Sequence, residues 1–329
     1  MTIQTRKEVE KSFHKDYFIT DISIRTNGYI DMILKKAQED PLEFTDFSIL
    51  SCSHSEDIWL YQHNAFHTRY LNADYAITPK EEYVVLMSNG EVHILSKPTH
   101  PEKNIPAIPP MIDGGPLFAK TLSDGKIYTV SYNRIVMRRD ASDKWTHLSA
   151  GLPSVKESIK ESEKTNRSIG FFTIDSFSEN DIYAGGGDGD LWHWNGNQWT
   201  MIDFPFNSYI DHIICGDDGQ VYISTNDGII IGYDNTWKFV DISDDIDVIV
   251  ETMVWYKDRL YIATATQLYQ IKDNLFSLAK LDGHKNRPYY WRTLAVGAGI
   301  MVAGYLDSVV VYDGKNLTKI LTLPNDIYG

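Results

Sequence analysis

The chain has 329 residues, 43% hydrophobic and 23% charged, which is the composition of a globular protein with ample apolar side chains for a core. Its formal net charge of −14 argues against a nucleic-acid-binding surface, because such surfaces need basic residues to displace counterions. It lacks an apolar run of about 18 residues, a secretory signal and a disulfide framework. We therefore expect a cytoplasmic protein without nucleic-acid or membrane partners.

The N-terminal third is the least regular part of the sequence. Residues 17–36 predict a hairpin or a strand followed by a helix, and we assign residues 1–40 to an N-terminal extension. Residues 57–71 and 82–96 each contain strand-like apolar runs around a turn, as expected of degenerate copies of one sheet unit. The proline-rich segment 97–110 predicts a loop.

From about residue 120 onward, one unit recurs roughly every 40 residues, and its clearest copy is Asp181–Trp199. Each copy contains four short apolar runs separated by turn residues. Asn195-Gly196 and Asp313-Gly314 indicate tight hairpins, because both residue types tolerate positive φ. We place the corresponding turn of an earlier copy at Asp140. Each copy therefore predicts a four-stranded antiparallel sheet.

One interval between copies is longer than the others. The extra residues form the charged segment 154–167, whose composition favours a helix. We interpret this segment as a helical insertion in the connection between two sheets.

A single four-stranded sheet cannot bury both of its faces, so repeated sheets must pack against one another. The period and the internal four-strand pattern predict an all-β fold, namely a β-propeller of four-stranded blades in one domain over residues 1–329. Seven blades fit the number of copies better than six. A β-sandwich or a β-helix fits the period less well.

Residues 181–199 resemble the short repeats of bacterial β-propellers, in which an Asp-hydrophobic-Tyr-Ala start leads through glycines to an Asn-Gly turn and a final Trp. The resemblance extends over about residues 120–323. Other copies keep the strands and turns but lose the glycines, as in residues 224–228. The resemblance implies the architecture and leaves the activity open, because propellers serve as enzymes, receptors and scaffolds.

The sequence carries no catalytic or metal-binding signature, so we predict no cofactor, no metal and no enzyme activity. The glycines of Gly185–Asp190 precede a strand, whereas a phosphate-binding loop precedes a helix, so we assign them to a tight turn. His63 and His67 lie in a predicted strand, where their spacing does not make a helical metal pair. Cys215 lies in an apolar strand and is predicted to be buried.

In a propeller, the connection between the second and third strands of each blade shares a face with the connections between blades. In this sequence these connections are rich in acidic, amide and aromatic residues, which partly reflects the needs of turns. We predict a partner-binding surface formed by Asp188, Asn226, Asp227, Asp244, Asp245, Asp247, Asp307, Phe206, Arg287, Tyr289 and Tyr290.

These observations favour a non-catalytic propeller that binds another protein. The most specific hypothesis is a cytosolic immunity protein that neutralises a bacterial toxin, which we expect to be basic because the chain is acidic. Degenerate repeats support this hypothesis, since they allow one specialised surface. The alternative is an enzyme of carbohydrate or small-molecule metabolism with carboxylates around an axial pocket.

Overall fold

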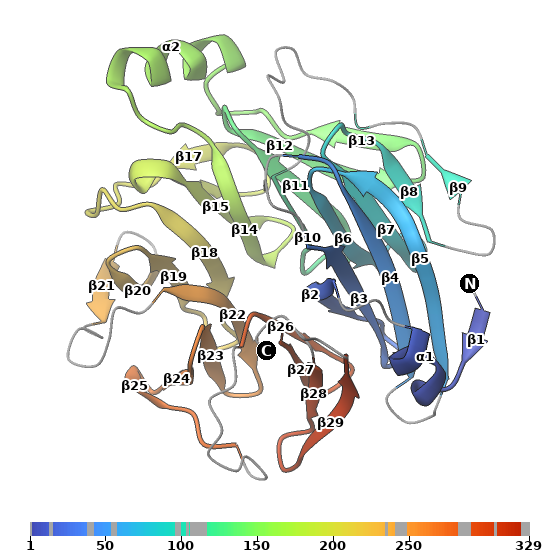
Figure 1. Cartoon of the computed structure of the whole chain (residues 1–329). Helices are drawn as coiled ribbons and strands as arrows, with labels where there is room; N and C mark the ends of the chain where they lie inside the picture. Colours follow the sequence, from blue (N-terminus) through green and yellow to red (C-terminus); the bar gives the residue numbers. More distant parts are fainter. Residues whose placement is uncertain are drawn as a thin grey trace. The chain divides into compact units, whose positions relative to one another are not determined.

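The computed structural model describes residues 2–12, 16–37, 43–53, 58–95, 100–102, 105, 117–233, 236–240, 249–281, 291–305 and 308–323 (Figure 1). The chain forms two compact units. The first unit comprises residues 1–69 and 249–329, and the second unit comprises residues 70–248. The described part is nearly all β, and each sheet is antiparallel with strands that pair mainly in chain order.

The second unit contains four sheets of four strands each. They are β6 (Leu71–Ala76), β7 (Glu82–Met87), β8 (Val92–Ile94) and β9 (His100–Pro101); β10 (Phe118–Thr121), β11 (Ile127–Ser131), β12 (Ile135–Ala141) and β13 (Lys144–His147); β14 (Phe171–Ser178), β15 (Asp181–Gly186), β16 (Leu191–Trp194) and β17 (Trp199–Met201); and β18 (Ile210–Cys215), β19 (Val221–Thr225), β20 (Gly228–Tyr233) and β21 (Thr236–Val240).

The first unit contains two sheets of four strands and one of five. They are β22 (Val250–Tyr256), β23 (Arg259–Thr264), β24 (Leu268–Lys272) and β25 (Leu275–Leu278); β26 (Thr293–Gly297), β27 (Ile300–Gly304), β28 (Ser308–Tyr312) and β29 (Leu317–Thr322); and β1 (Thr2–Gln4), β5 (Trp59–Thr68), β4 (Thr45–Ser53), β3 (Tyr29–Lys36) and β2 (Tyr17–Ile24) in pairing order. Helix α1 (Arg6–Ser12) contacts β5 and β29.

These seven sheets are the blades of a seven-bladed β-propeller, so the predicted fold class is confirmed. The structure also accounts for the N-terminal region. Residues 17–36 form the predicted hairpin, in which Ile24 pairs with Ile30. Because β3 also pairs with β4, the hairpin belongs to a sheet rather than to a separate extension.

Two blades carry a tyrosine at the same place in their second strand, Tyr128 in β11 and Tyr222 in β19. Tyr128 and Tyr222 are buried, and each hydroxyl donates to an aspartate in the preceding turn. Tyr128 Oη lies 3.0 Å from Asp124 Oδ2, and Tyr222 Oη lies 2.7 Å from Asp218 Oδ2. The repeat therefore closes a hairpin and satisfies a buried phenol with the same residue pair.

The predicted insertion contains helix α2 (Val155–Thr165), which follows β13 in Figure 1. Ser154 caps its N-terminus and Glu157 completes a capping box, which satisfies backbone N–H groups of the first turn. Asn166 ends the helix in the left-handed conformation, with φ 53°. The predicted turn at Asp140 is wrong: Asp140 lies in β12, and the turn contains Asp143 with φ 58°.

The glycine run before Asp190 ends in the predicted turn between β15 and β16, and it also permits a close backbone approach. Of this run, Gly189 has a positive φ of 76°. A Cβ on Gly186 would lie 1.9 Å from the carbonyl oxygen of Gly170, and one on Gly187 would lie 2.0 Å from that of Ser168. Residues 168–170 thus cross this run at a distance that only glycine permits.

Candidate functional site

The predicted surface residues that the structure describes come from one group of loops in the second unit. Asp188 lies in the short 3-10 turn η1 (Gly187–Gly189), Phe206 lies between β17 and β18, and Asn226 and Asp227 form the turn between β19 and β20. The Gly189 amide donates to the Ser208 carbonyl over 2.9 Å. These loops therefore lie side by side, although their role in binding stays a prediction.

Two hydrogen bonds join the loop before β18 to the turn after β19. The Tyr209 amide donates to Asn226 Oδ1 over 3.2 Å, and the Ser208 hydroxyl donates to Asp227. The other predicted surface residues lie outside the described residues: Asp244, Asp245, Asp247, Arg287, Tyr289, Tyr290 and Asp307.

Beside these loops lies an aromatic cluster, by which we mean Tyr132, Phe172 and Tyr209. Phe172 stacks on Tyr209 with ring centroids 4.9 Å apart, and Tyr132 meets Phe172 edge-on at 5.6 Å. Tyr132 and Tyr209 are 43% and 36% exposed. The cluster thus presents aromatic rings to solvent, which is a common property of binding surfaces.

The cluster was not predictable from the sequence, because Tyr132 follows β11, Phe172 lies in β14 and Tyr209 precedes β18, in three different blades. Local alternation could not have found it either, because the pairing of β14 with β15 is irregular between Phe171 and Thr173, so strand periodicity does not fix the direction of Phe172.

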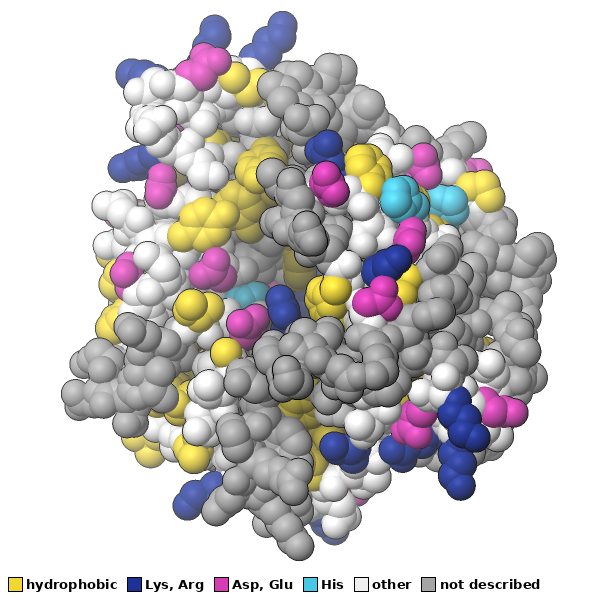
Figure 2. Space-filling model, viewed as in Figure 1, with side chains coloured by type: hydrophobic (Ala, Val, Ile, Leu, Met, Phe, Trp, Pro, Cys, Tyr) yellow, Lys and Arg dark blue, Asp and Glu magenta, His cyan; other side chains and the backbone are white. Residues whose placement is uncertain are grey.

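The surroundings of Tyr209 change the acidity of its phenol. Burial, with smaller contributions from the Tyr132 phenol and the Asp211 and Asp188 carboxylates, raises the pKa of Tyr209 to about 12. The phenol therefore keeps its proton at physiological pH. Burial also raises the pKa of Asp211. On the face seen in Figure 2, hydrophobic and acidic side chains lie next to one another where Figure 1 shows β14, β15 and β18.

A buried ion-pair network lies next to the cluster. Arg134, whose side chain is 3% exposed, donates through Nε to both Asp190 oxygens at 2.9 and 3.0 Å. Asp190 also accepts from the Trp192 indole at 2.8 Å. The Arg134 guanidinium lies 5.2 Å from the Trp192 ring centre. The charges on Arg134 and Asp190 are thus paired and hydrogen-bonded, as buried charges must be.

Helix α2 is attached to this network through Glu161. Its carboxylate accepts from Arg134 Nη1 at 2.8 Å and from Nη2 at 3.2 Å. The hydrogen bond from Arg134 is the main reason that the pKa of Glu161 lies below its usual range. The predicted insertion is therefore bound to the turn between β11 and β12, next to Tyr132.

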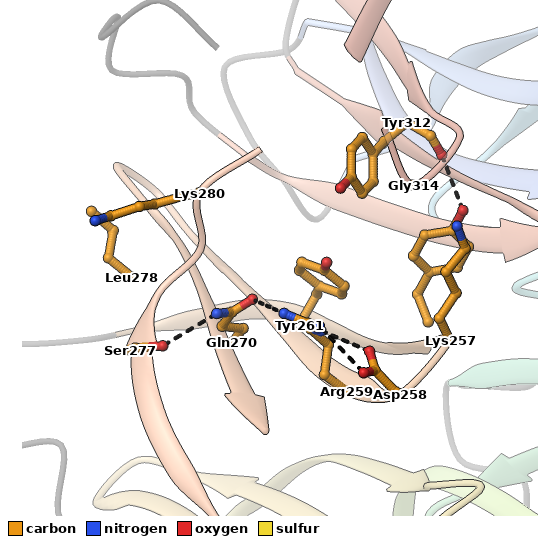
Figure 3. Close-up of a pocket in the computed structure, with 11 residues that line it drawn as sticks. Lys257, Asp258, Arg259, Tyr261, Gln270, Ser277, Leu278, Lys280, Tyr312 and Gly314 are labelled. Carbon is orange, nitrogen blue, oxygen red and sulfur yellow. Dashed lines mark hydrogen bonds and ion pairs between the residues drawn. The ribbon is translucent and has the colours of Figure 1, made fainter. Parts of the chain in front are cut away.

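A different kind of site lies in the first unit, where a pocket of about 380 Å³ opens between the sheets β22–β25 and β26–β29 (Figure 3). We call it the tyrosine pocket. It is lined by Tyr256, Lys257, Asp258, Arg259, Tyr261, Gln270, Ser277, Leu278, Lys280, Tyr312 and Gly314. Three of these residues are cationic and one is acidic, which contrasts with the net charge of the chain.

The chemistry of the tyrosine pocket does not match a two-carboxylate hydrolase. Such an enzyme needs a pair of carboxylates across the substrate. The pocket is lined by the carboxylate of Asp258, which Arg259 and Lys272 both contact. Hydrogen bonds from these two cations hold the pKa of Asp258 well below its usual range, so the carboxylate is ionised and engaged.

Neither metal ligation nor a membrane helix is found in the described residues. They contain no group of three or more His, Cys, Asp or Glu side chains that could hold a metal ion. No described helix is long and apolar enough to span a membrane. The exposed His67 contacts Asp46, with 2.8 Å between Nδ1 and Oδ1. Cys215, which was predicted to be buried, is half-buried at the end of β18, and desolvation raises the pKa of its thiol.

No family model matches the chain. The chain is similar to a curated protein named immune protein Tsi7 of Pseudomonas aeruginosa. The two are 26% identical over 246 residues, which cover 74% of this chain and 76% of that protein. This similarity supports the prediction of a non-catalytic protein.

Solved structures support the fold. The chain is similar to YCF48 bound to a D1 peptide, with a TM-score of 0.61, 11% identity, and coverage of 94% of this chain and 96% of that one. It is also similar to the WD40 β-propeller domain of Doa1, with a TM-score of 0.61, 12% identity, and coverage of 91% and 93%. At such low identity these similarities show the propeller fold alone.

Proposed function

We propose that this chain is a cytoplasmic immunity protein that binds and neutralises a basic bacterial toxin. The observation that carries the proposal is the similarity to immune protein Tsi7 over about three quarters of both chains. A protein of that kind needs a specific binding surface and no catalytic residues. The propeller provides a rigid scaffold whose loops can form such a surface.

The expected basic character of the toxin comes from charge. The chain carries 45 acidic and 31 basic residues other than histidine. Among the described residues of the predicted surface, Asp188 and Asp227 are acidic. Opposite charges accelerate association and discriminate against acidic partners. Binding should therefore become slower as salt is added.

Growth rescue tests the proposal. Each gene that flanks the gene for this chain in its source genome is expressed in a bacterial host, with and without this chain. We expect one flanking product to arrest growth and this chain to restore it. We also expect the two purified proteins to elute as one complex in size-exclusion chromatography. If no flanking product is toxic, or if the chain neither rescues growth nor forms a complex, the proposal is wrong.

A further inference from the structure

We infer that the aromatic cluster of Tyr132, Phe172 and Tyr209 is the anchor of the toxin-binding surface, and that an arginine or lysine side chain of the toxin packs on its rings. This inference rests on the proposed function, because it identifies where the toxin is held and by which chemistry. The argument uses the exposure of the cluster, its rigidity and its charge.

The cluster combines ring contacts with solvent exposure. Phe172 contacts both tyrosines, and Tyr132 and Tyr209 expose 43% and 36% of their surface. Contiguous exposed aromatic surface marks interaction sites, and Tyr is among the residues that dominate binding energies. The stacked pair Phe172–Tyr209 offers ring area that does not need to be assembled on binding.

The backbone holds the cluster in place from three sides. Tyr132 forms an isolated β-bridge with Gly170, where any Cβ would lie 2.6 Å from the Tyr132 Cα. A Cβ on Gly186 would lie 2.8 Å from Cδ2 of Phe172. The Tyr209 amide is fixed by Asn226. Side chains that are already ordered lose little conformational entropy on binding, so the cluster is suited to be an anchor.

The charge around the cluster selects a cationic partner. Asp188 lies in η1, whose Gly189 amide donates to the carbonyl of Ser208, the residue before Tyr209. The Ser208 hydroxyl donates to Asp227, and Asp211 follows Tyr209 by two positions, so three carboxylates lie on the backbone around this ring. The nearby guanidinium of Arg134 is buried and already engaged by Asp190 and Glu161. A cation over an aromatic ring is attracted by the ring quadrupole, and neighbouring carboxylates add to this attraction.

Three rings are too small to form a complete interface, since a stable one buries about 800 Å² on each partner. The adjacent loops with Phe206, Asn226 and Asp227 extend the surface around the cluster. This arrangement gives an aromatic centre and a polar edge, which is the usual anatomy of a protein interface.

A peptide experiment tests the chemistry of the cluster directly. The probe is a capped tetra-arginine peptide, and the neutral control is a tetra-citrulline peptide of similar shape. We expect the arginine peptide to bind the unaltered protein more tightly at low salt. Tyr209→Ala should weaken that binding about tenfold or more, whereas Tyr209→Phe should retain most of it.

The matched control variant is Tyr233→Ala. Tyr233 is 41% exposed at the end of β20 and packs on Phe177, outside the aromatic cluster. The substitution Tyr233→Ala should therefore leave binding of the arginine peptide unchanged. The inference is overturned if the arginine peptide does not bind the unaltered protein, if the citrulline peptide binds equally well, or if Tyr209→Ala and Tyr233→Ala have equal effects.

The toxin itself separates this inference from the proposed function. With the toxin found by growth rescue, Tyr209→Ala should raise the dissociation constant about tenfold or more, and Tyr233→Ala should not. If both variants bind the toxin like the unaltered protein, the immunity function stands and the cluster is not its anchor. If no flanking toxin is found, the proposed function fails, and the peptide experiment still decides the chemistry of the cluster.

Discussion

The aromatic cluster of the second unit and the tyrosine pocket of the first unit use similar rings in opposite electrostatic surroundings. Asp188 and Asp227 lie on the loops beside the cluster, whereas the pocket is lined by three cations and one carboxylate. Tyr132 and Tyr209 of the cluster are exposed to solvent, whereas the pocket has a volume of about 380 Å³. The same residue type can therefore favour cations in one place and anions in another, depending on the neighbouring charges.

The two regions also differ in what holds them. The cluster lies next to the buried ion pair of Arg134 and Asp190, whereas Tyr256 of the pocket donates a neutral hydrogen bond to the Gly299 carbonyl at 2.8 Å. A buried ion pair costs much more to break than a neutral hydrogen bond, because a lone buried charge remains. Stability measurements can therefore test this comparison.

The largest effect is expected for Arg134→Ala, which leaves Asp190 buried without its cation. We expect the free energy of unfolding to fall by about 3–5 kcal/mol. The matched change is Lys257→Ala in the pocket. Lys257 is exposed and donates to the Asp313 carbonyl over 3.0 Å, so its loss should cost about 0.5–1 kcal/mol. Urea denaturation followed by tryptophan fluorescence measures both. Equal losses would contradict the distinction between the two regions.

The next effect concerns the backbone that supports the cluster. Gly189 has φ 76°, and a Cβ there would lie 2.3 Å from the Phe206 carbonyl oxygen. Gly219 has φ 80° and open space around the same position. Gly219→Ala should cost about 1–2 kcal/mol from conformational strain, and Gly189→Ala about 3 kcal/mol because overpacking is added. Thermal unfolding of both variants checks this, and equal midpoints would show that the loop adjusts freely.

The strands of both regions were predictable from the sequence, because the repeat fixes their order and spacing. The tight turn at Asn195-Gly196 and the helical insertion also follow from local propensities. Local rules succeed there because they concern neighbouring residues. The same rules wrongly placed a turn at Asp140. The turn residue is Asp143, three positions later, because the hairpin of β12 and β13 is irregular.

The contacts that define the two sites were not predictable in this way. Arg134 and Asp190 are 56 positions apart, and nothing in a single sequence pairs them. The glycine run before Asp190 ends in the predicted turn, η1, but its close approach to residues 168–170 could not be predicted, because that segment lies before the preceding strand. The pocket joins residues of two sheets, such as Tyr261 and Tyr312. Such sites depend on how blades pack, which the repeat pattern does not encode.

A smaller effect tests the neutral hydrogen bond of the pocket. Tyr256→Phe removes the donor to the Gly299 carbonyl, which joins β22 to the turn between β26 and β27. We expect a loss of about 1 kcal/mol. Tyr132→Phe in the cluster should change stability by no more than about 0.5 kcal/mol, because its ring is 43% exposed. The denaturation midpoints of Tyr256→Phe and Tyr132→Phe measure both effects. A larger loss of stability for Tyr132→Phe than for Tyr256→Phe would contradict the comparison.

The smallest effect is a pH dependence confined to helix α2. The hydrogen bond from Arg134 lowers the pKa of Glu161. A lowered carboxyl pKa means that the stabilising contact is fully present above 4.5, the usual value, and is lost as the pH falls through the folded-state pKa. Acidification should therefore weaken the attachment of α2, which amide hydrogen-exchange protection factors, corrected for intrinsic rates, can measure.

The control for this pH dependence lies on the same helix. Glu161→Gln should remove most of the change in protection, whereas Glu163→Gln makes the same change in charge and should leave it. A residual dependence is expected from Glu157, since its hydrogen bonds with Ser154 also lower its pKa. If Glu161→Gln and Glu163→Gln behave alike, the carboxylate of Glu161 does not attach the helix. The cluster would then be held without α2, by its glycine contacts, the Asn226 hydrogen bond and the neighbouring Arg134–Asp190 pair.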